Sequence, residues 1–136
     1  MKHKRDEGTA TAFVVVWLMA AMLLSGLVFD CGMAIASKVS AVDVAQAASR
    51  AGARELDVTA LRTTGTIRLD PIKAEIAARD WLVRSGINGT WIVTVIGNQV
   101  TVTITSAQPT QLLHLAGIEQ IPLHASATAD AISPAR

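Results

Sequence analysis

The chain has 136 residues, which is enough for one small domain and an appended segment. Lys and Arg number 12 against 11 Asp and Glu, so the formal net charge is +1, and this balance argues against nucleic acid as a partner. The single cysteine, Cys31, excludes an intrachain disulfide, so the fold depends on its core alone.

An uncharged apolar stretch, residues 9–29, dominates the N-terminal part of the sequence. A helix of this length rises about 31 Å, which matches the hydrocarbon core of a bilayer. The preceding residues, 1–8, include three basic side chains, which favour a cytoplasmic N-terminus. The sequence therefore predicts a single-pass anchor in contact with membrane lipid, with the rest of the chain outside the cell membrane.

A secretory signal peptide is the competing interpretation of the same stretch. Residues 34–36 read Ala-Ile-Ala, a small-residue pattern that would place a signal-peptidase cut between Ala36 and Ser37. The apolar run is longer than the usual h-region, however, and Asp30 interrupts the approach to the cut. We therefore favour an uncleaved anchor.

An alanine-rich segment, residues 30–58, follows the span and is predicted to continue as a helix outside the membrane until about Leu56. A stripe of small residues at helical spacing would let another element approach closely. Two alternatives remain open: the stripe packs on the chain's own C-terminal domain, or it packs against neighbouring copies or partner subunits. On the second alternative the candidate helix-packing residues are Asp30, Gly32, Ala41, Ala45, Ala48 and Gly52.

Three motifs follow one another in this part of the chain: Gly8 before the span, Phe29-Asp30-Cys31-Gly32 at its end, and an alanine-rich segment over residues 43–53 that includes Asp43 and Gln46. With these motifs, residues 5–56 resemble the TadE/TadG-like family of tight-adherence (Flp) pilus assembly proteins.

The resemblance implies a membrane-anchored, pilin-like or accessory subunit of a type IV-like pilus system. Its partners would be other pilus assembly subunits or further copies of itself. The family also implies prepilin-type cleavage after Gly8, which would leave Thr9 as the new N-terminus. A glutamate is expected five residues beyond that cut, but this chain has Phe13 there. This departure favours an unprocessed, accessory role.

Residues 59–131, here called the head, are predicted to form a small α+β domain that begins with a short strand at 66–69. Asp70 then caps a helix that starts at Pro71 and stops at Gly86. The β-branched runs 90–96 and 100–105 predict a hairpin.

A short helix at 110–116 and a strand at 123–129 complete the head. This order is that of the split βαβ, ferredoxin-like fold (βαββαβ). If the first strand does not form, a three-stranded antiparallel sheet with helices on one face remains. Trp81 and Trp91 are expected to fill the core, and residues 132–136 are expected to be a flexible tail.

The sequence shows no Ser/His/Asp set, phosphate loop, carboxylate pair or metal-ligand spacing. We therefore expect no enzymatic activity, no catalytic or metal site, no cofactor and no small-molecule substrate. The leading hypothesis is a membrane subunit of a tight-adherence pilus system that acts by helix packing and head contacts. The alternative is a small secreted or envelope-anchored binding module released after a signal peptide. A weaker third hypothesis is an envelope protein whose head binds wall polymer.

Overall fold

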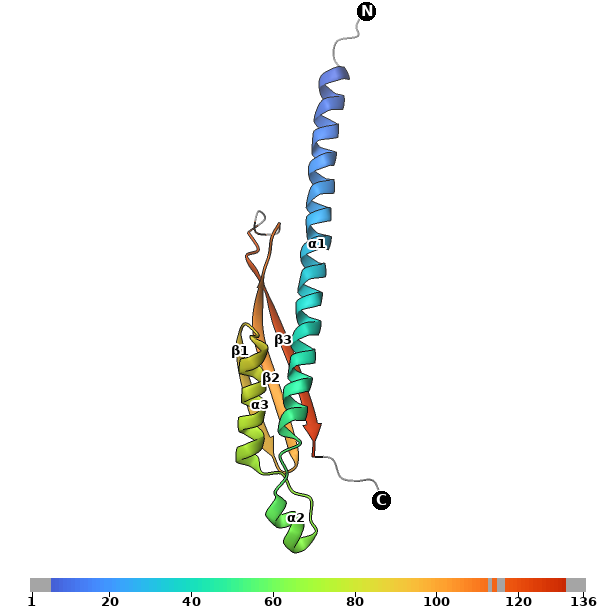
Figure 1. The fold of residues 1–136 in the computed structure, drawn as a ribbon. Helices are drawn as coiled ribbons and strands as arrows, with labels where there is room; N and C mark the ends of the chain where they lie inside the picture. The colour runs from blue at the N-terminus through green and yellow to red at the C-terminus, as the bar shows by residue number, and fades with distance from the viewer. Residues whose placement is uncertain (1–5, 113, 115–116, 132–136) are drawn as a thin grey trace, which may run out of the picture. The chain divides into compact units, whose positions relative to one another are not determined.

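The computed structural model describes residues 6–112, 114 and 117–131. The order of elements is α1 (Asp6–Gly52), α2 (Val58–Thr64), α3 (Pro71–Ser85), β1 (Thr90–Ile96), β2 (Gln99–Pro109) and β3 (Gln120–Asp130) (Figure 1). The predicted α+β class is confirmed, with a long apolar N-terminal helix followed by a three-stranded antiparallel sheet. The basic N-terminal residues, among them Lys2 and Lys4, and the predicted tail 132–136 lie outside the described residues.

The chain divides into two compact units by its internal contacts. The first, the helix–loop unit, comprises Met1–Ile35 and Gln108–Ile121. The second, the sheet unit, comprises Ala36–Ala107 and Pro122–Arg136. Helix α1 contributes to both units, because its N-terminal part belongs to the first and its last turns belong to the second.

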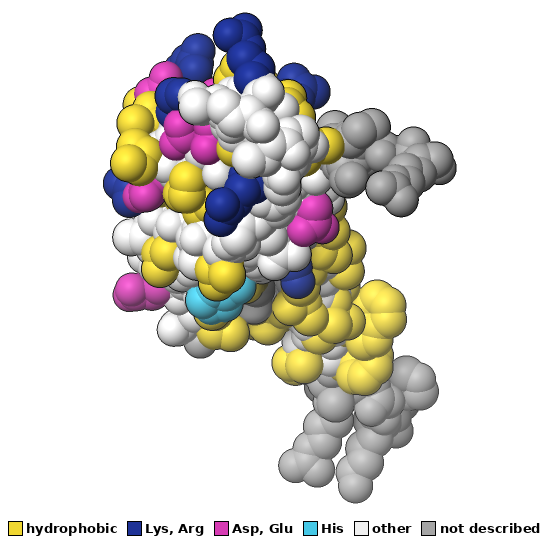
Figure 2. Space-filling model, turned by 90° about the horizontal axis from the view of Figure 1, so that it is seen from below, with side chains coloured by type: hydrophobic (Ala, Val, Ile, Leu, Met, Phe, Trp, Pro, Cys, Tyr) yellow, Lys and Arg dark blue, Asp and Glu magenta, His cyan; other side chains and the backbone are white. Residues whose placement is uncertain are grey.

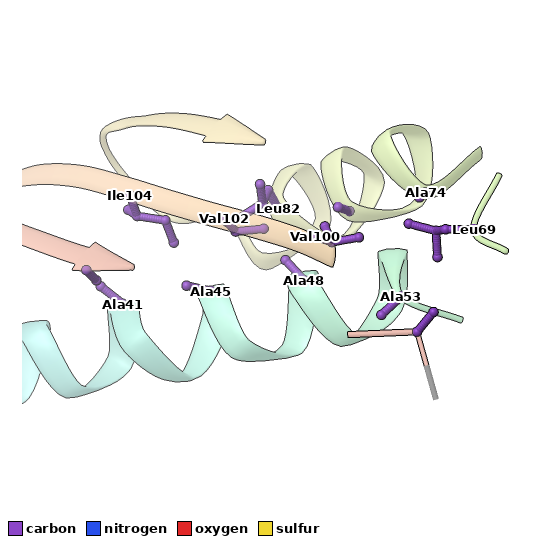
Figure 3. Close-up of a cluster of buried hydrophobic side chains, with 13 residues drawn as sticks. Ala41, Ala45, Ala48, Ala53, Leu69, Ala74, Leu82, Val100, Val102 and Ile104 are labelled. Atoms are coloured by element: carbon purple, nitrogen blue, oxygen red, sulfur yellow. The ribbon is translucent and has the colours of Figure 1, made fainter. Parts of the chain in front are cut away.

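The core of the sheet unit combines small side chains on the helices with branched side chains on the sheet. One face of α1 and one face of α3 contribute mainly alanines, and β2 presents Val100, Val102 and Ile104, each almost fully buried (Figure 3). Small side chains let the helix axes approach the sheet, and the bulk of the core then comes from the strands. The buried cluster consists of Ala41, Ala45, Ala48, Ala53, Leu69, Ala74, Ala78, Leu82, Val100, Val102, Ile104, Ala125 and Ala131.

Helix α3 begins and ends where the sequence predicts. The Asp70 carboxylate accepts the backbone N–H of Lys73 at 3.2 Å, and Pro71 occupies the first turn, where its missing donor costs nothing. The hydrogen bond from the Lys73 side chain, 3.0 Å away, lowers the pKa of the Asp70 carboxyl below its ordinary value. Gly86 ends the helix in the left-handed conformation at φ 63°, which glycine adopts without strain.

The predicted hairpin is also confirmed, with Ile96 paired to Gln99 across a two-residue turn. Asn98 in that turn joins distant segments: its side chain accepts the Leu69 N–H and donates to the Ile67 carbonyl, and its own carbonyl accepts the Ala131 N–H. The face of the sheet away from the helices is lined by hydroxyls that bond across strands, as in the 3.0 Å contact between Thr101 and Thr128. Cross-strand pairs of this kind hold the register of the sheet.

Of two further elements predicted for the head, one does not form and the other is only partly described. The expected strand at 66–69 is reduced to a single bridge between Leu56 and Leu69, so the ferredoxin-like order is wrong and the simpler three-stranded sheet remains. In segment 66–69 the Leu69 N–H and the Ile67 carbonyl bond to the Asn98 side chain, so the pairing with residues 56 and 57 does not extend into a strand. Within 110–116, residues 110–112 are not helical and residue 114 lies in a 3-10 turn, while the rest of that prediction lies outside the described residues.

The expectation that both tryptophans fill the core is wrong for Trp81, which is 45 % exposed. Trp91 does pack against the buried cluster, and the Arg79 guanidinium lies over its ring at 5.7 Å. The reason is that α3 turns its Ala74–Ala78–Leu82 face to the sheet, and Trp81 projects from the neighbouring side of the helix.

Gly52 provides a direct test of the close packing in the sheet unit. A Cβ at this position would lie 2.8 Å from the Ala74 carbonyl oxygen and 3.1 Å from Val100 Cγ1. We expect Gly52→Leu to lower the free energy of unfolding by about 1–3 kcal/mol, as overpacking does elsewhere. Thermal unfolding of the full chain in lipid nanodiscs, followed by circular dichroism, measures the change.

The matched control is Gly32→Leu, because no atom lies within 4 Å of a Cβ built at Gly32. This variant should be at least as stable as the wild type, because leucine also favours the helix more than glycine does. An equal loss of stability in both variants would show that helix sequence, and not contact with the sheet, sets the requirement for glycine.

Candidate functional site

The apolar part of α1 is exposed around most of its circumference, apart from the face at Gly26. Its large side chains, from Phe13 to Phe29, are 43 % to 73 % exposed, and the helix is long and apolar enough to cross a membrane. The one polar side chain in its second half, Ser25, donates its hydroxyl to the Ala21 carbonyl at 2.8 Å, so its donor is satisfied within the helix. An apolar surface of this size on a folded chain marks contact with lipid or with other proteins.

Asp30 ends this surface and is itself only 2 % exposed. Its carboxylate accepts two backbone hydrogen bonds from the helix–loop unit: Oδ1 from the Gln111 N–H and Oδ2 from the Leu112 N–H, both at 2.9 Å. Bonds from N–H groups to a charged acceptor contribute about 1.5–3 kcal/mol each. One side chain therefore joins α1 to the segment that connects β2 with β3.

The same connecting segment is closed on itself by further bonds. The Thr110 N–H donates to the Glu119 carbonyl at 3.0 Å, and the Thr110 hydroxyl donates to the carbonyls of Ile118 and Glu119. The Gly117 N–H donates to the His114 carbonyl at 3.0 Å. These bonds hold Gln111 and Leu112 at the position where their N–H groups meet Asp30.

Gly26 provides the apolar contact next to this polar one. It lies one turn before Asp30, and a Cβ built on it would stand 2.9 Å from the Leu112 Cβ. Any larger residue at position 26 would push Leu112 away from the helix. Leu112 thus contacts α1 at two points: its N–H group bonds to Asp30, and its side chain packs on Gly26.

The remaining residues near the predicted processing sites lie along α1. Gly8 and Thr9 fall within its first turns, and their side chains lie outside the described residues. Cys31, Gly32 and Ala36 are exposed, and Ser37 is half-buried.

The small-residue stripe lies in the core of the sheet unit. Ala41, Ala45 and Ala48 are 2 % exposed or less, and Gly52 contacts α3 and β2. In this structure the stripe is therefore occupied by the chain's own sheet and α3. Gly32 alone among the predicted helix-packing residues is open to a neighbour.

The sheet unit offers a second apolar surface on α3. Ile72, Ile76 and Val83 are each more than half exposed, and a shallow groove between α1 and α3 is lined by Val44 and Trp81 among others. On the face drawn in Figure 2, Lys and Arg side chains lie among Asp and Glu side chains with hydrophobic side chains between them. Among the described residues, no group of three or more His, Cys, Asp or Glu side chains could hold a metal ion.

Sequence reasoning identified Asp30 but missed its partners. Gln111 and Leu112 act through their backbone N–H groups, which every residue except proline carries, so no residue type in the loop signals the contact. The usable signal was the carboxylate itself, because a charge at the end of an apolar run needs either water or donors.

Comparison with known proteins identifies a similarity in this N-terminal part of the chain. Residues 8–55 match the family model described as Putative Flp pilus-assembly TadE/G-like. No match was found among curated proteins or among solved structures. The matched segment contains the apolar surface, Asp30 and the small-residue stripe, and the resemblance read from the sequence is confirmed by this match over residues 8–55.

Proposed function

We propose that this chain is a single-pass membrane subunit of a tight-adherence (Flp) pilus assembly system. Its N-terminus would lie in the cytoplasm, and the head, residues 59–131, would lie outside the membrane. The observation that carries the proposal is the exposure of every large apolar side chain from Phe13 to Phe29, within the segment that matches the TadE/G-like family. A helix of this kind needs lipid or other helices around it.

The subunit would act by binding other proteins and not by catalysing a reaction. Within the membrane, the exposed apolar side chains would meet helices of further copies or of other pilus subunits, and Gly32 would do so just outside it. Outside it, the exposed stripe Ile72, Ile76 and Val83 on α3 is the surface that we assign to head contacts with those subunits. Exposed apolar side chains gathered on one helix are typical of protein interfaces.

The alternative, a secreted binding module released after Ala36, is disfavoured by Asp30. A cut between Ala36 and Ser37 would remove the carboxylate that accepts the N–H groups of Gln111 and Leu112. Prepilin-type cleavage after Gly8 would leave that contact in place. The loop geometry thus supports a mature chain that keeps Asp30.

N-terminal sequencing of the mature protein separates these outcomes. We expect the chain recovered from the membrane fraction to begin at or before Thr9. Thr9 itself would indicate prepilin-type processing despite Phe13, whereas an uncut N-terminus would indicate an accessory subunit. A mature chain that begins at Ser37 would contradict the membrane-subunit proposal.

Asp30→Ala tests whether the contact between α1 and the loop matters for assembly. The variant should still insert, because the apolar span is unchanged, but it leaves two N–H groups without their acceptor, at a cost of about 1–3 kcal/mol for each. We expect a normal amount of protein in membranes and a loss of pili by electron microscopy. Asp30→Asn keeps one acceptor oxygen and should give an intermediate loss.

The control for Asp30 is Asp80→Ala, which removes an exposed carboxylate paired with Arg84 on α3. An exposed pair of this kind contributes little, so pilus number should not change. Unchanged pili in Asp30→Ala cells would reduce Asp30 to a boundary residue of the span.

Lateral assembly is tested through the exposed thiol of Cys31. A short bis-maleimide applied to membranes should trap this chain with itself or with another pilus subunit, and Cys31→Ser should abolish the product. Gly32→Leu places a bulky side chain beside Cys31 where the structure has open space, so it should reduce the yield without affecting folding. A chain that stays monomeric under all these conditions would remove the assembly proposal.

A further inference from the structure

The loop between β2 and β3 contacts α1 at the level of the apolar span. Leu112 lies against Gly26, which precedes Asp30 by four residues, or about 6 Å along a helix axis. The residues that flank Gly26 on α1 include Leu23, Leu24, Leu27 and Val28, all of them exposed. The loop is therefore seated next to side chains that the proposed function places in lipid.

The surface of the loop suits this position. Ile118 is 48 % exposed and Leu112 is 37 % exposed, and residues 110–118 contain no Asp, Glu, Lys or Arg. The first charged residue after Pro109 is Glu119, which begins the return towards β3. An uncharged loop with exposed large aliphatic side chains is stabilised when these side chains leave water and enter the interfacial layer of a bilayer.

Where that layer borders the hydrocarbon core, unpaired N–H and C=O groups of an irregular loop become costly because water is scarce. Four N–H groups of the described part of this loop have protein partners. The N–H groups of Gln111 and Leu112 donate to Asp30, and those of Thr110 and Gly117 donate to carbonyls within the loop. The Thr110 hydroxyl is also satisfied by loop carbonyls.

We propose that this loop is a second membrane-contacting element, seated on α1 in the interfacial layer on the head's side of the bilayer, with Leu112 and Ile118 towards phospholipid. The proposal rests on the membrane-subunit function and extends it. Asp30 is then the group that lets irregular backbone enter the layer. The membrane contact of the chain becomes a helix with an attached loop, which fixes the helix–loop unit at a defined depth.

The test measures depth with a fluorescent label. In a full-length Cys31→Ser background, single cysteines at Ile118, Leu23 and Ile92 carry the environment-sensitive dye NBD. Leu23 marks the span, and Ile92 is an exposed apolar position on β1. The labelled proteins are reconstituted in phosphatidylcholine vesicles with or without lipids that carry a doxyl quencher near the head group.

We expect the dye at 118 to emit at shorter wavelength than the dye at 92 and to be quenched by the shallow doxyl lipid, whereas the dye at 92 is not. Quenching at 23 by a doxyl group deep in the acyl chain confirms insertion of the span. If 23 is quenched but 118 behaves like 92, the loop proposal is overturned and the anchor stands. If 23 is not quenched by any lipid, the proposed function itself fails.

Two further results complete the design. Gly26→Val places a side chain where Leu112 sits, so it should weaken quenching at 118 and leave that at 23 unchanged. A short-wavelength emission at 118 without quenching by lipid would mean that a second protein chain, and not phospholipid, covers the loop, and this outcome overturns the proposal.

Discussion

The contact of the Asp30 carboxylate with two backbone N–H groups is the interaction on which the arrangement of the helix–loop unit depends. A carboxylate at the end of an apolar helix has to be solvated, and here the solvation comes from the chain's own loop in place of water. The same bonds satisfy donors of an irregular segment that has no strand partner. The carboxylate thus gives the loop N–H groups an acceptor, and those N–H groups solvate the carboxylate. Either group would be unsatisfied at this position without the other.

The sheet unit is stabilised by a different device, the division of bulk between helices and strands. Alanines on α1 and α3 allow close approach, and Val100, Val102 and Ile104 fill the space between them. As a consequence, the larger apolar side chains of α3, such as Ile76, lie outside the core and are exposed. A core of this type is intolerant of added volume, and it leaves apolar surface available for a partner.

Much of the fold follows from local signals in the sequence. The caps at Asp70 and Gly86 and the turn at Asn98 rest on chemistry that acts within a few residues, and all were predictable. Trp81 and the segment 66–69 were not, because their environment is decided by which face of α3 packs and by a side chain some 30 positions away. For Asp30 the sequence indicated that the carboxylate needs hydrogen-bond donors. It could not indicate which residues supply them, because nearly every residue type carries a backbone N–H group.

The separation of the two halves of the Asp30 contact has a consequence for the order of events during synthesis. Gln111 follows Asp30 by 81 residues. Because a chain emerges from its N-terminus, the apolar helix is complete long before the loop exists. The carboxylate is therefore hydrated at first. It exchanges water for the N–H donors of the loop only after the loop has been synthesised. The loop is thus the last part of the helix–loop unit to be synthesised, and β3 follows it.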